Sequence, residues 1–227
     1  MSIFAKIFVI FAVAVAIGCS VVGSSAPAVG LEQIAPTPVA ENGSSTAKGL
    51  QTAVFAGGCF WGVEAVFEHV KGVTDVKSGY AGGDAKTADY EKVSEGDTGH
   101  AESVKITFDP TKVTYTQLLT VFFSVAHDPT ELNYQGPDHG TQYRSAIFYA
   151  DDEQKTLALA YIDAINKSKA FSKPVVTEVV PLKAFYEAEA YHQDYLVHHP
   201  DEPYIVYNDL PKIAALKAKF PDLYVEK

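Results

Sequence analysis

The chain has 227 residues, 47% of them hydrophobic and 20% charged, and a formal net charge of −10 at pH 7. This balance is typical of a globular protein with enough length for one hydrophobic core. Because the charge is acidic and no basic patch is present, we expect no nucleic-acid partner.

Residues 1–19 predict a signal peptide. A short segment carrying Lys6 precedes an unbroken apolar run over 7–17, which is too short to span a bilayer and matches a secretory core segment. The run leads to Cys19 in a context that resembles a bacterial lipoprotein cleavage box, where the cysteine is lipidated, although Ala16 departs from the usual box. A plain signal peptide cut near Ala26–Ala28 remains the main alternative, and an uncleaved anchor fits less well. Either cleavage gives an exported, periplasmic protein, and lipidation would also anchor it to the membrane.

Residues 20–48 are rich in Ser, Ala, Pro, Gly and Thr and show no periodic apolar pattern. Such a segment cannot bury enough apolar surface to offset the loss of chain entropy, so we expect a disordered tether. The folded domain is therefore predicted to run from residue 49 to residue 227.

The domain opens with a short apolar run over 52–56 that ends at two glycines, which predicts a buried strand stopped by a turn. Apolar side chains at helical spacing follow over 63–70, and Gly72 would end that helix. Cys59 therefore lies where a strand passes into a helix. The next strand is expected over 73–80, which gives a β-α-β start.

The later segments alternate in the same way. The pattern predicts a strand over 103–109, a helix over 114–126, a strand over 144–150, a helix over 151–169, a strand over 175–182 and a short helix around 213–220. Alternating strands and helices in one domain favour an α/β (α+β) fold with helices packed on a mixed sheet. The polar loop over 127–143 is long for a compact domain, and loops of that length are usually functional or mobile.

Cys59 is the only cysteine after residue 19, and it lies among glycines and aromatic residues beside Trp61, the one tryptophan. A lone thiol of this kind is either a small inert core residue or a reactive group. The unpaired N–H groups and the dipole at a helix N-terminus would lower its pKa from about 8.5 toward neutrality, which favours the reactive thiolate. Phe60 and Trp61 would then lie at the mouth of a site, or else be ordinary core aromatics.

The apolar residues at 104, 106 and 108 alternate with polar ones, as on a strand with one buried face. Glu102 is two residues before the first of them and would lie on the same face. If the strand extends that far, Glu102 points to the apolar side, where burial raises a carboxyl pKa as a general acid requires. A strand-end glutamate turned to solvent is the alternative. His100 beside it could act as a base, although a surface turn is the commoner place for such a histidine.

The end of the long loop offers Asp138 as an acceptor and Tyr143 as a donor for a polar ligand atom, or else forms a satisfied loop network. Tyr80 and Tyr90 are further phenols, of the kind that mostly pack half-buried. Neither Cys-x-x-Cys nor His-Glu-x-x-His occurs, and the sequence has no P-loop and no Gly-x-Gly-x-x-Gly. We therefore expect neither a metal site nor a bound nucleotide.

Taken together, these segments resemble the A-type peptide methionine sulfoxide reductase family. The matching strings, in the family's order and spacing, are GGCFWGVE at 57–64, GYAGG at 79–83, DYEKVSEGDTGHAE at 89–102, HDPT at 127–130, DHGTQYRSAI at 138–147 and AYHQDYL at 190–196. The combination of GCFWG, GHAE and DHGTQYRS is very specific to that family.

The resemblance implies a single-domain α/β plait with a ferredoxin-like mixed sheet, and the reduction of S-epimer methionine sulfoxide, free or in proteins. By position, Cys59 would be the nucleophile that attacks the sulfoxide sulfur and becomes a sulfenic acid, and Glu102 the acid that protonates the oxygen. A sulfoxide oxygen leaves only when protonated, so a neutral carboxylic acid suits this step. The substrate-binding residues would be Phe60 and Trp61 at the S-methyl group, Tyr90 and Tyr143 on the oxygen, and Asp138 ordering the pocket.

Many members of the family carry resolving cysteines that capture the sulfenic acid as a disulfide. Here Ser94 takes one such position, and residues 201–227 contain no cysteine. Cys19 lies beyond the tether and would be blocked if lipidated. We therefore expect a one-cysteine enzyme that binds no cofactor, is reset by a thioredoxin-like protein or another external thiol, repairs oxidised exported proteins and works as a monomer.

Two other functions remain open from the residues alone. Cys59 activated by His100 or His192 would make a cysteine-dependent acyl hydrolase. An aromatic slot without chemistry would instead make a tethered domain that captures a thioether side chain.

Overall fold

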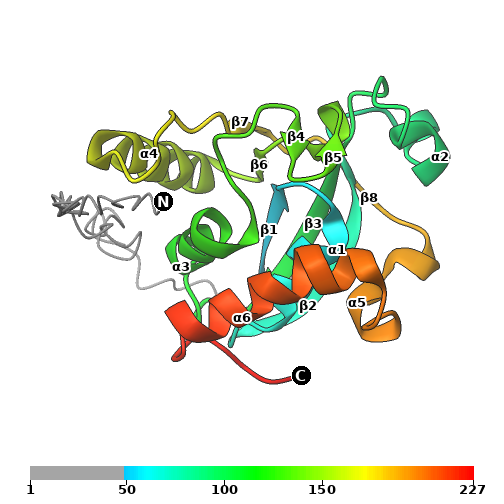
Figure 1. The fold of residues 1–227 in the computed structure, drawn as a ribbon. Coiled ribbons are helices and arrows are strands. Elements are labelled where there is room, and N and C mark those ends of the chain that lie inside the picture. Colours follow the sequence, from blue (N-terminus) through cyan, green and yellow to red (C-terminus); the bar gives the residue numbers. More distant parts are fainter. Residues whose placement is uncertain (1–48) are drawn as a thin grey trace, which may run out of the picture.

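The computed structural model describes residues 49–227, and the predicted signal peptide, the predicted tether and Cys19 lie outside the described residues. Its centre is a six-stranded sheet in the order β7-β6-β1-β3-β2-β8, beside which a two-stranded hairpin pairs β4 with β5 (Figure 1). The strands are β1 (Gln51–Ala56), β2 (Val73–Ala81), β3 (Ala101–Phe108), β4 (Tyr134–Gln135), β5 (Asp138–His139), β6 (Ala146–Tyr149), β7 (Glu178–Pro181) and β8 (Phe185–Glu187).

The helices are α1 (Phe60–Glu68), α2 (Tyr90–Val93), α3 (Tyr115–Val121), α4 (Asp152–Ser168), α5 (Tyr195–His198) and α6 (Leu210–Lys219). The sequence predicts α1, α3, α4 and α6, whereas the four-residue helices α2 and α5 have no predicted counterpart. Helix α1 contacts β2 and β3, and α6 lies alongside α1 (Figure 1). Helix α4 contacts α3 and the strands β6 and β7.

The sheet is mixed, which confirms the predicted fold class. Strand β3 pairs antiparallel with both β1 and β2, so β1 and β2 run parallel with β3 between them. The predicted β-α-β unit of β1, α1 and β2 is therefore present, with β3 inserted. Strands β6 and β7 pair in parallel.

The main core lies on the face of the sheet that α1, α3, α4 and α6 cover. Its largest side chains include Phe55, Phe67, Ile106, Leu118 and Phe122, each less than 2% exposed. A smaller apolar cluster that includes Val54, Ala101 and Phe148 covers the other face. Because the residues at 102, 104, 106 and 108 alternate with those of the second face, β3 presents Glu102 toward the main core.

Three further parts of the chain differ from the predicted elements. The helix predicted over 114–126 is α-helical only to Val121 and continues as a π-helical turn over 122–126, where the Nδ1 atom of His127 lies 3.1 Å from the Phe122 carbonyl. The loop over 127–143 contains the β4–β5 hairpin. Strand β8 has no predicted counterpart, because three residues at a sheet edge give too short an alternation to detect.

No helix within residues 49–227 combines the length and the apolar character that crossing a membrane would require.

Candidate active site

Cys59 lies at the start of α1, in the tight connection from β1, as the sequence predicts. It is the N-cap residue of the helix and is 8% exposed. Gly58 before it has φ of +90°, and a Cβ there would lie 2.6 Å from Cγ of Gln135, so only glycine fits this turn. The connection thus holds the thiol at the edge of the core, below the surface.

The electrostatic environment of Cys59 corrects one prediction. Burial first, and then the negative charges of Glu102 and Asp209, raise the pKa of the Cys59 thiol well above its ordinary value. The backbone N–H of Trp61 and the cation of Lys212 lower the pKa, but by less than the opposing effects. The expected net lowering by the helix N-terminus is therefore wrong, because burial and two carboxyl groups outweigh it. The thiol is protonated at rest.

Glu102 lies in β3 with its side chain 3% exposed. Its Oε2 accepts a hydrogen bond of 3.1 Å from the backbone N–H of Phe60, the residue that follows Cys59. Burial, with a smaller contribution from Asp138, raises the pKa of Glu102 to about 8, and the Phe60 N–H only partly offsets this. At neutral pH the carboxyl group is therefore mostly protonated and lies next to the first turn of α1.

The predicted oxygen-binding residues gather around the same point. Tyr143 is half-buried, and burial, followed by Glu102, Asp138, Cys59 and Tyr90, raises its pKa, so the structure brings these five groups together. The pKa of Tyr90 is also raised by burial and by the charges of Glu102 and Cys59. Both phenols therefore remain protonated donors at neutral pH.

Phe60 and Trp61 differ in exposure. Phe60 is 1% exposed, with its ring centroid 5.0 Å from that of His192, so it forms the inner wall. Trp61 is partly exposed and stacks on Tyr195 with ring centroids 3.7 Å apart and planes 6° apart. Its Nε1 donates a hydrogen bond of 3.1 Å to Nδ1 of His192, and Tyr204 meets it edge-on at 5.9 Å. An aromatic wall thus lies beside a cluster of proton donors and a thiol.

Known proteins of one family are similar to this chain in sequence and in fold. The family model described as peptide methionine sulfoxide reductase matches residues 51–223. The chain belongs to the peptide methionine sulfoxide reductase family. It is 62% identical to peptide methionine sulfoxide reductase MsrA 2 of Mesorhizobium japonicum, over 80% of this chain and 93% of that protein. It is 52% identical to MsrA 2 of Synechocystis, over 84% of this chain and 90% of that protein.

Solved structures agree with the sequence matches. Mxr1 of Saccharomyces cerevisiae in reduced form matches with a TM-score of 0.60 and 35% identity, covering 67% of this chain and 87% of that one. Methionine sulfoxide reductase A of Corynebacterium diphtheriae matches with a TM-score of 0.58 and 34% identity, covering 68% and 77%. The chain is accordingly an A-type methionine sulfoxide reductase, an oxidoreductase.

Sequence reasoning missed the contribution that the C-terminal segment makes to the reductase site. This segment supplies Tyr204, whose hydroxyl donates to Oδ2 of Asp138, and Asp209, whose charge reaches Cys59. It also supplies His192, which accepts the hydrogen bond from Trp61, and Tyr195, which stacks on Trp61. These residues lie in short helical turns without apolar periodicity, so only the family string at 190–196 marks part of the segment in advance.

The two histidines considered for an acyl hydrolase are engaged elsewhere. His100 Nδ1 accepts the N–H of Gly83, and its Nε2 lies 3.0 Å from the carbonyl of Asp84. His192 accepts the Trp61 indole. Within the described part of the chain, no histidine hydrogen-bonds to Cys59, so the pairing that would activate a cysteine hydrolase is missing.

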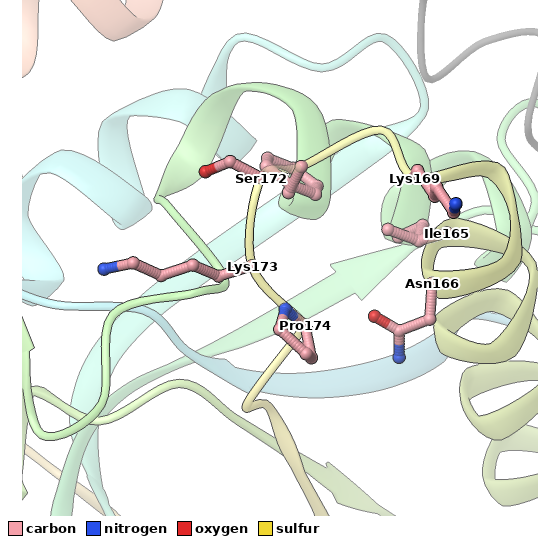
Figure 2. Close-up of a pocket in the computed structure, with 7 residues that line it drawn as sticks. Ile165, Asn166, Lys169, Ser172, Lys173 and Pro174 are labelled. Atoms are coloured by element: carbon pink, nitrogen blue, oxygen red, sulfur yellow. The ribbon is translucent and has the colours of Figure 1, made fainter.

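Two further features bear on ligands. Residues 49–227 contain no group of three or more His, Cys, Asp or Glu side chains placed to share a metal ion. A hollow of about 470 Å³ lies where α4 ends, and Figure 2 shows Asn166 of α4 facing Pro174 across it. Its lining is Ile165, Asn166, Lys169, Phe171, Ser172, Lys173 and Pro174. It contains none of the residues gathered around Cys59 and no thiol, carboxyl or imidazole group.

Proposed function

We propose that this reductase acts on the S epimer of methionine sulfoxide, free or in proteins, with Cys59 as nucleophile and Glu102 as acid. The observation that supports this most directly is the hydrogen bond from the Phe60 N–H to Glu102. It places a carboxyl group with a pKa of about 8 beside the residue that carries the thiol. A proton donor and a nucleophile at one point are what sulfoxide reduction needs.

The proposed reaction begins when the Cys59 sulfur attacks the sulfoxide sulfur while Glu102 protonates the oxygen. The sulfur–oxygen bond of the substrate breaks, the oxygen passes to Cys59, and the thiol's proton restores Glu102. The balance is one thiol and one sulfoxide converted into one sulfenic acid and one thioether. Two electrons pass from Cys59 to the substrate, so this step needs no bound cofactor.

The half-buried groups around Cys59 would orient the substrate. Tyr90 and Tyr143 would donate hydrogen bonds to the sulfoxide oxygen, and Phe60 with Trp61 would contact the S-methyl group. Asp138, held by Tyr204, would order the pocket. Because the oxygen and the methyl group then have separate binding positions, the opposite sulfur epimer would direct its oxygen away from the donors.

An external thiol would complete the cycle. Cys59 is the free cysteine of residues 49–227, and Ser94 lies exposed at the end of α2. One thiol would condense with the sulfenic acid to give a mixed disulfide and water, and a second would release Cys59. A thioredoxin-like protein or a small thiol could supply both. Mass spectrometry after one equivalent of sulfoxide tests this, and an intramolecular Cys19–Cys59 disulfide would contradict it.

The predicted signal peptide over 1–19 leads us to propose repair of oxidised exported proteins by a periplasmic enzyme. The resemblance of the sequence at Cys19 to a lipoprotein cleavage box supports lipid anchoring, whereas cleavage near Ala26–Ala28 would give a mature chain without Cys19 and without the anchor. The mass of the mature N-terminus decides between the two, since a lipidated Cys19 adds the mass of its acyl chains.

Turnover tests the proposed function directly. We expect dithiothreitol-dependent reduction of dabsyl-methionine S-sulfoxide by the intact chain and none by Cys59→Ser. Retention of the sulfoxide or thioether without turnover would favour a binding domain. Activity on the R epimer alone would contradict the proposal.

A further inference from the structure

A buried ion pair lies against the first turn of α1, outside the residues to which the proposed reaction assigns a role. Asp209, at the end of the helical turn over 205–209, is 0% exposed. Its Oδ1 lies 3.1 Å from Nζ of Lys212, in the first turn of α6, and the Lys212 side chain is 19% exposed. Both residues belong to the C-terminal segment, and Asp209 is the N-cap residue of α6.

Gly62 shows how closely the pair approaches that helix. A Cβ built on Gly62 would collide with Oδ1 of Asp209 and would lie 2.8 Å from Nζ of Lys212. The two side chains thus fill the space that any other residue at 62 would need. Gly62 is three positions after Cys59, on the first turn of α1.

One oxygen of the pair lacks a partner. Oδ2 of Asp209 is buried and has no hydrogen-bond partner within residues 49–227. Burying a carboxyl oxygen without a partner is costly, so its presence calls for an explanation. The two charges of the pair also act on the Cys59 thiol. The charge of Asp209 raises the pKa of Cys59, and the charge of Lys212 lowers it.

We propose that Asp209 and Lys212 are paired positioning residues for Cys59, which hold each other against Gly62 and set a negative and a positive charge near the sulfur. This inference rests on the proposed role of Cys59 as nucleophile. The titratable groups whose charges interact with Cys59 come from several elements. They are Glu102 from β3, Tyr90 from α2, Tyr143 from the helical turn over 141–143, Tyr195 from α5, Tyr204 beside the helical turn over 205–209, and the pair itself. Lys212 is the cation among them, and it would stabilise the negative charge that develops on sulfur as the thiol loses its proton.

The test measures the thiol without any sulfoxide. In the purified full chain, the rate of iodoacetamide alkylation at Cys59, quantified on its own peptide so that Cys19 does not contribute, is followed against pH. We expect Lys212→Met to raise the apparent pKa by about one unit, a roughly tenfold loss of alkylation rate below the pKa, and Asp209→Asn to shift it in the opposite direction. Lys212→Arg keeps the charge and should stay near the parent. Lys217→Met is the matched control, since Lys217 lies on the same helix and its ion pair with Glu226 is exposed.

Opposite shifts from Lys212→Met and Asp209→Asn support the proposal, because loss of structure alone would not move the pKa in two directions. Equal behaviour of Lys212→Met and Lys217→Met would overturn it, and so would shifts of the same sign. If Asp209→Asn does not fold, as judged by circular dichroism, the contrast between Lys212→Met and Lys212→Arg decides.

Steady-state kinetics give a second readout, in which Lys212→Met lowers kcat and leaves KM unchanged. Alkylation requires no reductase activity, so failure of the proposed function would be seen separately, as absent turnover with the pKa shifts intact.

Discussion

Two buried glutamates near α1 have similar environments but different hydrogen bonds. Glu102 is 3% exposed and Glu64 is 2% exposed, and burial raises the pKa of each to about 8. Both oxygens of Glu64 accept backbone hydrogen bonds, from the N–H of Ser78 and from the N–H of Asp194. Only Oε2 of Glu102 does so, from Phe60, and its Oε1 accepts none from residues 49–227.

The difference shows that a buried carboxyl group with a raised pKa does not by itself mark a catalytic acid. Glu64 connects α1 to β2 and to the start of α5, so both of its oxygens are used to hold the fold together. Glu102 keeps one oxygen available beside Cys59, where a proton can be passed to a substrate. The predictions below compare the two regions, beginning with the largest expected effect.

Substituting each glutamate by glutamine should separate chemistry from structure. Glu102→Gln should lower kcat/KM for methionine S-sulfoxide by about 100- to 10,000-fold, because an amide cannot act as a general acid. Folded Glu64→Gln should keep kcat/KM within a few-fold of the parent. Steady-state turnover with dithiothreitol measures both, and equal losses in the two variants would remove the distinction.

The pH dependence of stability should show the protonated state of Glu102. Its folded pKa of about 8 is above its ordinary value of 4.5. Below pH 4.5 both folded and unfolded states hold the proton, and as pH rises to 8 the unfolded state loses it first. The folded state therefore loses stability over this window, by about 1.4 kcal/mol per pH unit for one group.

Glu102→Gln removes this dependence. Its free energy of unfolding, measured by urea titration, should therefore rise relative to the parent between pH 5 and pH 8, with the difference largest at pH 8. A constant difference across the window would mean that Glu102 is ionised in the folded protein.

Glu64→Gln should instead cost stability at low pH. Glutamine has one acceptor oxygen, so it can serve only one of the N–H groups of Ser78 and Asp194. The Ser78 N–H also donates to Oε1 of Gln193, so the cost is that of one lost hydrogen bond and leaves no N–H unpaired. The expected loss is about 1 kcal/mol. Urea titration at pH 5 measures it, with Glu102→Gln as the control that should lose little because it needs only one acceptor.

The segment around residues 192–194 forms hydrogen bonds both to Glu64 and to Trp61 of the aromatic wall, so a substitution there tests the role of the wall. Asp194 donates to Glu64, and two residues earlier His192 accepts the indole N–H of Trp61. His192→Ala should release Trp61 and raise KM by about two- to tenfold, which is the value of one hydrogen bond. A fall in kcat at unchanged KM would show that His192 acts on the chemical step instead.

The sequence predicts the region around Cys59 and Glu102 well. A short apolar run that ends in glycines, followed by helical spacing, places Cys59 at the start of α1. The parity of β3 places Glu102 on the core side. Both signals come from local patterns of apolar residues, which burial in the core enforces.

The rest of the site could not be predicted in this way. Tyr204 and Asp209 lie in a segment of short helical turns, where no periodicity shows which side chains face inward. The burial of Cys59 and the charges of Glu102 and Asp209 come from residues far apart in the chain, which local reasoning about a helix N-terminus omits. For this reason the predicted direction of the Cys59 pKa shift was wrong.

A single turnover tests the central claim most directly. The reduced chain is mixed with one equivalent of methionine S-sulfoxide without a reductant, and the mass of the Cys59 peptide is followed with time after trapping by dimedone. The account predicts one dimedone adduct on Cys59, formed from the sulfenic acid with loss of water, for each methionine formed, at a rate that Glu64→Gln preserves and Glu102→Gln lowers by about 100-fold or more. Methionine formed without oxidation of Cys59, or at the same rate in Glu102→Gln, would contradict it.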